Sequence, residues 1–283
     1  MPLTYVERIP FVYPTGQQDL HANFHADPTG IYFASRGKVF AYEPNGDRLA
    51  SSDIILQNHP NTANDRIWGF TKTSDGNWAT LTRDAGTGII GTIRLYSPTG
   101  TQMRVANVPD VVTGINTVSN AWRAPKALVE VSGFFYVRVV RDVSGNMRWV
   151  KFDSTLDVQD DDLIINNANP TSLSDAASNG YQNILIVQHN QDIVYGIKAS
   201  DATIVSNLQT DLEARNTDPF GASAYGNYLY IADLGGFVYT YSGVPQRVIS
   251  ASNADGGAIL TAFGLYSLNA FAAREFNQPR RRF

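Results

Sequence analysis

Val39-Phe40-Ala41-Tyr42-Glu43-Pro44-Asn45-Gly46 has a close echo further along the chain, in Ile93-Arg94-Leu95-Tyr96-Ser97-Pro98-Thr99-Gly100. Each stretch reads as a β-strand that runs into a turn of the form Pro-x-Gly. Each also follows another apolar, β-prone run that opens at a turn of small residues. A phrase that recurs at this spacing predicts a repeat architecture.

The same small-residue turn marks the start of the second strand in every predicted unit. Its positions are Gly30, Gly76, Gly133, Asn183, Gly226 and Gly264, with asparagine replacing glycine in the fourth unit. Asparagine is the residue that best tolerates positive φ after glycine. Six units in 283 residues give about 47 residues each, which is typical of four-stranded propeller blades.

The last unit lacks an outer strand, and the N-terminal stretch Tyr5–Tyr13 has no partner in the first unit. We therefore predict an all-β, six-bladed β-propeller whose N-terminal strand completes the last blade. Pro10 suits an outer strand, because proline in sheets is confined to edges. Residues 1–283 are predicted to form one domain, with a basic C-terminal tail at 279–283.

Three local features complete the predicted secondary structure. Residues 47–52 and 101–106 are polar enough to be outer, fourth strands. Leu173–Ser178 could form one turn of helix. No long helix is expected elsewhere.

The composition excludes several classes of function. The net charge of −4 gives no overall electrostatic reason for binding nucleic acid. The absence of cysteine rules out disulfides and thiol chemistry. The chain as written shows neither a signal peptide nor an apolar run of membrane-spanning length, so we expect it in the cytoplasm or in a virion.

Histidines are few, and two lie close together. His21 and His25 flank Asn23 and would share one face of an innermost strand. They could begin a metal site, but zinc needs a third or fourth ligand. The other two histidines, His59 and His189, fall in predicted loops. We favour a structural or surface role for these side chains and predict no metal, no catalytic residue and no cofactor.

Two further motifs have competing interpretations. The acidic run 157–162 could supply oxygen ligands to calcium, but it lacks the glycine and distal glutamate of an EF-hand loop. A solvated sheet edge that blocks aggregation explains it equally well. The Gly86-x-Gly88-x-x-Gly91 spacing resembles a dinucleotide fingerprint, but a strand follows where that motif needs a helix, so we interpret it as a hairpin loop.

The longest irregular stretch, residues 107–126, carries the predicted binding residues. An aromatic side chain, a fork-shaped cation and amides on one loop make a recognition surface, formed by Asn116, Asn120, Trp122 and Arg123. The alternative is that Trp122 fills a gap between blades. The tail Arg280-Arg281-Arg282-Phe283 could grip an acidic partner or simply be a solubilising end.

The phrases Asp27-Pro28-Thr29-Gly30-Ile31-Tyr32-Phe33-Ala34 and Phe40–Gly46 resemble a blade of the β-propeller superfamily, in the style of NHL and lactonase repeats. The Trp-Asp ending of WD40 blades is missing, and the acidic metal ligands of gluconolactonases find no counterpart. In style the chain is also similar to propeller modules of phage tail-nozzle proteins.

These observations favour a non-enzymatic scaffold that binds protein partners in an assembly, as a structural or attachment component of a virion, and that forms oligomers. The alternatives are a propeller hydrolase or lactonase with a metal at the channel mouth, and a glycan-binding module with Trp122 as stacking platform. No catalytic motif such as Gly-x-Ser-x-Gly is present.

Overall fold

The structure is a computed structural model in which twelve segments of the chain are described. They are residues 3–12, 24–60, 67–83, 91–109, 126–141, 147–165, 173–178, 183–188, 193–199, 204–211, 219–233 and 236–243.

The strands of the described segments form five antiparallel sheets of four strands each, called blades 1 to 5 below. Blade 1 contains β2 (Phe24–Asp27), β3 (Gly30–Ser35), β4 (Lys38–Tyr42) and β5 (Ile54–Ile55). Blade 2 contains β6 (Ile67–Lys72), β7 (Trp78–Arg83), β8 (Gly91–Tyr96) and β9 (Gln102–Asn107). Blade 3 contains β10 (Lys126–Val131), β11 (Phe134–Arg141), β12 (Met147–Phe152) and β13 (Val158–Ile165). Blade 4 contains β14 (Leu173–Ser178), β15 (Asn183–Gln188), β16 (Ile193–Lys198) and β17 (Ile204–Gln209). Blade 5 contains β18 (Pro219–Tyr225), β19 (Tyr228–Asp233), β20 (Phe237–Ser242) and β1 (Thr4–Pro10).

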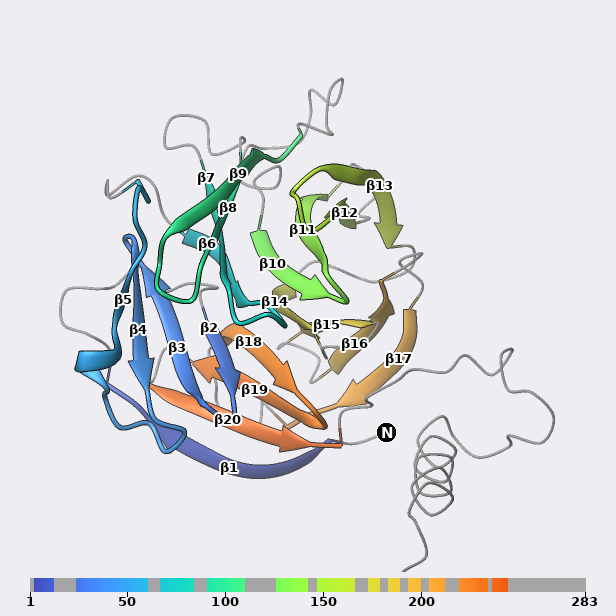
Figure 1. Ribbon diagram of the computed structural model, residues 1–283. Coiled ribbons are helices and arrows are strands. Elements are labelled where there is room, and N and C mark those ends of the chain that lie inside the picture. The colour runs from blue at the N-terminus through green and yellow to red at the C-terminus, as the bar shows by residue number, and fades with distance from the viewer. Residues whose placement is uncertain are drawn as a thin grey trace, which may run out of the picture.

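The five blades surround a common centre, with the first strand of each blade innermost (Figure 1). Along the series β2, β6, β10, β14 and β18, each inner strand contacts the next, and β18 contacts β2. The ring of described blades is therefore closed. This is the arrangement of a β-propeller, and it corrects the prediction of six blades.

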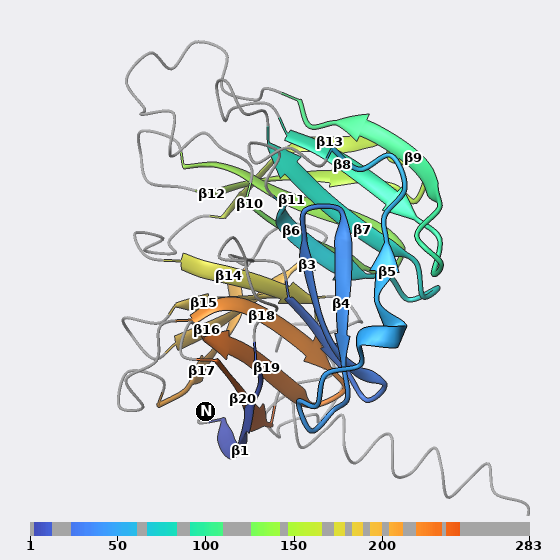
Figure 2. The same ribbon diagram turned by 90° about the vertical axis from the view of Figure 1, so that its left-hand side faces the viewer.

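The N-terminal strand explains why the blade number was wrong. β1 pairs with β20, from Thr4 opposite Ser242 to Pro10 opposite Phe237, and so forms the outer strand of blade 5 (Figure 2). The prediction had placed this strand in a sixth blade built around Gly264. That position lies outside the described residues, and the ring already closes without it.

The hydrophobic core lies between neighbouring blades, because alternate residues of each strand face opposite sides of the sheet. One cluster joins blades 5 and 1 and includes Ile9, Phe11, Phe33 and Val238. Similar clusters join blade 1 to blade 2 and blade 2 to blade 3. Blades 1 and 2 are thus buried on both faces, which accounts for the near-continuous apolar runs of their middle strands.

Four of the predicted small-residue turns lie within the described residues, and each links the first and second strands of its blade. Gly30, Gly76, Gly133 and Gly226 lie in or beside these turns and have positive φ, although the φ of 159° at Gly30 is near extended backbone. In the fourth unit, β14 pairs with β15, which begins at Asn183.

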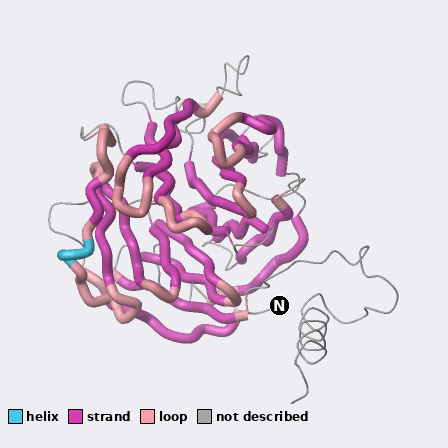
Figure 3. The backbone as a smooth tube through the Cα atoms, viewed as in Figure 1, coloured by secondary structure: helices cyan, strands magenta, loops and turns pink. Residues whose placement is uncertain are grey.

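Three local predictions have different outcomes. Residues 173–178 form strand β14, so the predicted helical turn is wrong. The fourth strand of blade 1 is Ile54–Ile55, not the predicted stretch 47–52. Within that stretch Arg48 makes an isolated bridge to Tyr42 of β4, and Ala50–Ser52 form a short 3₁₀ helix (Figure 3). β7 pairs with β8 on either side of residues 84–90, which confirms a hairpin in place of a dinucleotide motif.

The two echoed phrases end in turns that contact the preceding blade. Gly46 and Gly100 have φ of 92° and 88°, and each lies against backbone of the neighbouring outer strand, at Pro10 and Ile55 respectively. The hydroxyl of Tyr42 adds a hydrogen bond of 2.8 Å to the carbonyl of Val12. The Pro-x-Gly phrase therefore both reverses the chain and joins successive blades.

Candidate functional site

The binding residues predicted from sequence, Asn116, Asn120, Trp122 and Arg123, lie outside the described residues. They belong to the segment between the end of β9 and the start of β10. His21 and His189 also lie outside. The prediction for this loop stands as made.

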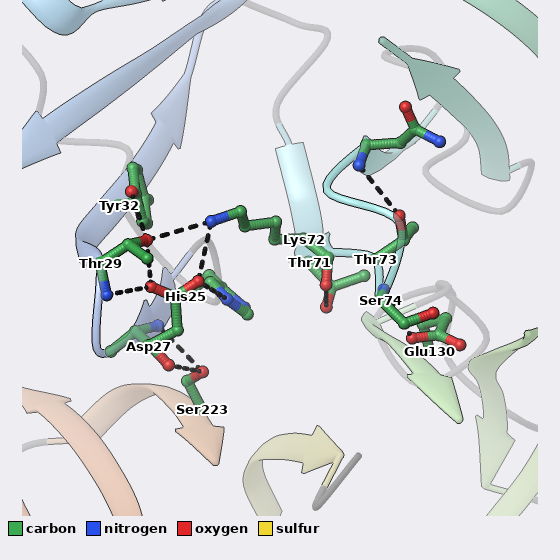
Figure 4. Close-up of polar contacts among 12 residues, drawn as sticks. His25, Asp27, Thr29, Tyr32, Thr71, Lys72, Thr73, Ser74, Glu130 and Ser223 are labelled. Carbon is green, nitrogen blue, oxygen red and sulfur yellow. Dashed lines mark hydrogen bonds and ion pairs between the residues drawn. The ribbon is translucent and has the colours of Figure 1, made fainter. Parts of the chain in front are cut away.

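Within the described residues, polar side chains gather where β2 and β6 end, between blades 1 and 2 (Figure 4). Asp27 is at the centre, with its side chain only 9% exposed. Its Oδ2 accepts a hydrogen bond from Lys72 Nζ at 2.8 Å and lies 3.4 Å from His25 Nε2. Its Oδ1 accepts from the backbone N–H of Thr29 at 2.7 Å and from the Thr29 hydroxyl.

The Thr29 hydroxyl extends this network to a tyrosine. Because it donates to Asp27, it acts as acceptor for Lys72 Nζ at 3.2 Å and for the Tyr32 hydroxyl at 3.0 Å. Lys72 also lies over two rings, 5.0 Å from the centroid of Tyr32 and 5.6 Å from that of Trp78. Lys72 is therefore held by charge, hydrogen bonds and cation–π contacts together.

Local sequence explains how blade 1 contributes to this group. His25 and Asp27 are two residues apart on β2, so they share one face, while Phe24 and Ala26 face the core between blades 5 and 1. Asp27 begins the turn that leads to Gly30 and accepts from the N–H two residues on, as aspartate does in Asx turns. Lys72 comes from another blade, 45 residues along the chain.

Burial and hydrogen bonds determine the charge states of His25 and Asp27. Burial disfavours the charged imidazole and lowers the pKa of His25, although its hydrogen bond to Asp27 opposes this. Burial alone would raise the pKa of Asp27, but hydrogen bonds from His25, Lys72 and Thr29 outweigh it and hold that pKa well below its usual value. At neutral pH the group is a neutral imidazole beside a carboxylate–ammonium pair.

Two more polar side chains, Glu130 and Ser223, join neighbouring blades (Figure 4). Glu130 at the end of β10 is buried and accepts from the backbone N–H of Gly133 and, at 3.3 Å, from that of Ser74 in blade 2. Ser223 of β18 exchanges hydrogen bonds with the backbone of Ala26 in blade 1, at 2.9 and 3.1 Å. These polar contacts thus link blades 5, 1, 2 and 3 near their inner strands.

The arrangement has limited catalytic capacity. A carboxylate that orients a neutral imidazole can serve a general base. However, both oxygens of Asp27 are occupied by donors from the chain itself, and those of Glu130 by backbone N–H groups. In the described segments, no three His, Cys, Asp or Glu side chains gather closely enough to hold a metal ion.

The acidic run 157–162 begins in a turn and continues along β13, the outer strand of blade 3. The side chains from Asp157 to Asp161 are exposed. Asp153, just before the run, accepts from the N–H groups of Thr155 and Asp157 and so shapes the turn. This placement matches the sheet-edge interpretation.

Sequence reasoning identified His25 but not its partners. It paired His25 with His21, although Asp27 at the same strand face was the available signal. Lys72, Glu130 and Ser223 carried no signal, because each has a hydrogen-bond partner in another blade.

The longest helix in the described residues is the three-residue 3₁₀ turn at Ala50–Ser52, far below the length that crosses a membrane.

No family model and no curated protein sequence matches the chain. Among solved structures, the glutaminyl cyclase of Myxococcus xanthus aligns with a TM-score of 0.55 and 9% identity, over 85% of this chain and 97% of that one. A luciferin-regenerating enzyme aligns with a TM-score of 0.52 and 12% identity, over 87% and 98% of the two chains. Regucalcin from Agrobacterium tumefaciens, a calcium-binding protein, aligns over 78% and 76% at 11% identity with a TM-score of 0.46. At such identities the likeness to the glutaminyl cyclase and the luciferin-regenerating enzyme concerns the fold alone, and the sheet topology shows that the chain is a β-propeller.

Proposed function

We propose that this protein is a non-enzymatic β-propeller scaffold that binds protein partners in a larger assembly, as a structural or attachment component of a virion. The observation that carries the proposal is that polar side chains near the inner strands form hydrogen bonds across the boundaries between blades. Asp27, Lys72 and Glu130 hydrogen-bond to one another's blades and hold the ring together. We interpret them as structural groups that join the blades and expect recognition to occur on the outer surface.

Exposed apolar side chains support an interaction role. Met103 and Val105 on the outer strand of blade 2 are 52% and 49% exposed, and Tyr225 in blade 5 is 51% exposed. Tyrosine and methionine are enriched at protein interfaces. The proposed recognition loop with Trp122 and Arg123 would add anchors of the type that dominates binding energy.

The experiment is sedimentation of material from cells or particles that contain the protein, with the untagged chain detected by antibody. Comigration with a particle, and its loss when Met103 and Val105 are replaced by serine, would support the scaffold. A monodisperse monomer that joins no particle and no partner would contradict it.

One observation favours a second candidate, a hydrolase of the lactonase type. His25 is neutral, 86% buried at its side chain and within 3.4 Å of a carboxylate, as a general base requires. The test is hydrolysis of a panel of lactones and esters with and without added divalent metal. Activity that His25→Ala abolishes, in a variant that stays folded, would establish the enzyme and displace the scaffold proposal.

The third candidate is glycan binding at Trp122, with Asn116, Asn120 and Arg123 as hydrogen-bonding neighbours. Aromatic rings offer the flat apolar face on which sugars stack. Glycan-array binding that Trp122→Ala removes would support this role, and an array without binding would exclude it for the glycans tested.

A further inference from the structure

Three tyrosines form a patch at the junction of blades 5 and 1. Tyr225 and Tyr228 lie directly opposite each other across the β18–β19 turn and are 51% and 39% exposed. Tyr230 lies two residues after Tyr228 on the same face, with ring centroids 6.4 Å apart. We call these three side chains the tyrosine patch. Of the three, only Tyr230 packs against the hydrophobic cluster between blades 5 and 1, so core packing does not account for Tyr225 and Tyr228.

Two carboxylates, Asp27 and Glu7, lie near Tyr230 of the tyrosine patch. Across the sheet, Tyr230 pairs with Thr240, and Thr240 pairs with Glu7 of the outer strand, whose side chain is exposed. Burial raises the pKa of Tyr230, and nearby Tyr228, Asp27 and Glu7 raise it further. Lys72 already neutralises Asp27, so Glu7 is the carboxylate left to attract a cation.

The buried hydroxyl of Thr240 lies in the same cross-strand row as Tyr230 and Glu7. Thr240 is 3% exposed, and its Oγ1 has no hydrogen-bond partner among the described residues. It lies between Tyr230 and Glu7 in the register of the sheet. This part of blade 5 therefore retains unused hydrogen-bonding capacity beside the tyrosine patch.

The chain leaves the described structure at this place. Gly243 follows β20, and its N–H donates a hydrogen bond of 3.0 Å to the carbonyl of Asn227, in the turn between Tyr225 and Tyr228. Figure 1 shows the end of β20 beside the start of β1. Residues 244–279, which are 36 residues, separate this point from Arg280. A chain spans up to about 3.3 Å per residue, so the C-terminus can return to the tyrosine patch.

The C-terminus has the chemistry that the tyrosine patch would recognise. Arg280, Arg281 and Arg282 are followed by Phe283. Guanidinium groups stack on aromatic faces and pair with carboxylates, and they do so better than ammonium groups. The chain uses this contact elsewhere, since the guanidinium of Arg8 lies 4.2 Å from the ring centroid of Phe237 in the same blade.

We propose that the basic C-terminal segment 280–283 docks in the same molecule on the tyrosine patch, with arginine side chains over Tyr225 and Tyr228 and beside Glu7. The occupant is this chain's own segment, because it is cationic and the chain departs from the edge of the patch. The docked segment would cover a junction between the first and last described blades.

The test uses the full chain, whose lack of cysteine allows clean double labelling. Donor and acceptor dyes are attached at Asn227→Cys and Gln278→Cys, and energy transfer is measured in single molecules. The matched control pair is Met103→Cys with Gln278→Cys, because Met103 is similarly exposed but lies on blade 2. Docking predicts high transfer for the first pair, low transfer for the second, and a loss of the difference in high salt.

Variants identify the contacts. Arg280, Arg281 and Arg282 all changed to glutamine should abolish the high-transfer population without touching the fold. Tyr228→Ala should lower the ratio of docked to undocked molecules roughly two- to five-fold, the effect of one exposed cation–π contact. Glu7→Gln should act in the same direction, whereas Met103→Ala should change nothing.

Equal transfer in both pairs, or high transfer that survives the arginine changes, would overturn the proposal. Transfer between singly labelled molecules that are mixed would also overturn it, by assigning the occupant to a second copy. If Tyr228→Ala lowers the melting temperature, the arginine variant alone decides, because residues 280–282 belong to none of the described strands.

Discussion

A single methyl group added at Gly100 should destabilise the protein far more than the same group added at Gly76. The two glycines occupy the same position of the same turn: Gly76 N–H bonds the Thr73 carbonyl and Gly100 N–H bonds the Ser97 carbonyl, each at 2.9 Å. Their φ angles are 80° and 88°. Both substitutions to alanine therefore carry the same conformational cost of roughly 1–2 kcal/mol for a left-handed residue.

The surroundings of the two turns differ. A Cβ at Gly76 meets nothing within 4 Å. A Cβ at Gly100 overlaps the carbonyl oxygen of Ile55 and lies 2.9 Å from both its carbonyl carbon and the Cγ2 of Ile54. These atoms are largely backbone of the neighbouring outer strand, so the blades must separate to relieve the overlap. Overpacking of this kind costs about 1–3 kcal/mol more.

The expected totals are roughly 1–2 kcal/mol for Gly76→Ala and roughly 2–5 kcal/mol for Gly100→Ala. In a domain of this size these correspond to falls in Tm of roughly 2–8 °C and 4–20 °C. Urea denaturation followed by tryptophan fluorescence measures the free energies, and scanning calorimetry measures Tm. Equal losses for the two variants would refute the close approach of blades 1 and 2 at this turn.

Three further predictions concern the polar group and the closing strand. Acid should destabilise the protein in two steps, because the folded pKa values of His25 and Asp27 both lie below their ordinary values of 6.5 and 3.8. The free energy of unfolding should fall as pH drops below 6.5 and again as it drops below about 4. His25→Asn should remove the first of these two steps in pH-dependent urea titrations. Lys72→Met should lower the free energy of unfolding by about 2–3 kcal/mol, near the low end for a buried ion pair because Lys72 is 20% exposed. Adding Asp27→Asn in the same chain should restore part of this stability. If the effects of the two substitutions are additive in the double variant, the two side chains do not interact. Deleting residues 1–14 removes β1 and should lower Tm for the whole molecule, whereas an unchanged Tm would disprove closure of the ring by β1.

Repetition made much of the fold predictable. The turns at Gly30, Gly76, Gly133 and Gly226 reverse the chain in a way that needs small residues, so each left a local signal. The number of blades, in contrast, left no local signal in the sequence. It depends on which strand pairs with β20, and a sixth small-residue turn at Gly264 suggested another unit beyond it.

The short strands and the polar group around Asp27 were harder to predict from the sequence, for a related reason. Ile54–Ile55 is a strand only because Lys38 and Val39 pair with it, and Leu173–Ser178 extends because β15 lies beside it. Tertiary pairing overrides local propensity in such segments. The group around Asp27 likewise joins residues from two blades, which no spacing along one strand reveals.

The pairing of β1 with β20 has a consequence for biosynthesis. Seven residues at the start of the chain must wait, without a sheet partner, until Phe237–Ser242 emerge from the ribosome. During that interval Ile9 and Phe11, which end up buried, are exposed, and so is the edge of whichever blade was made last. Cotranslational folding can therefore assemble successive blades but cannot finish the ring, and nascent chains stalled before residue 237 should depend on chaperones far more than the released protein does.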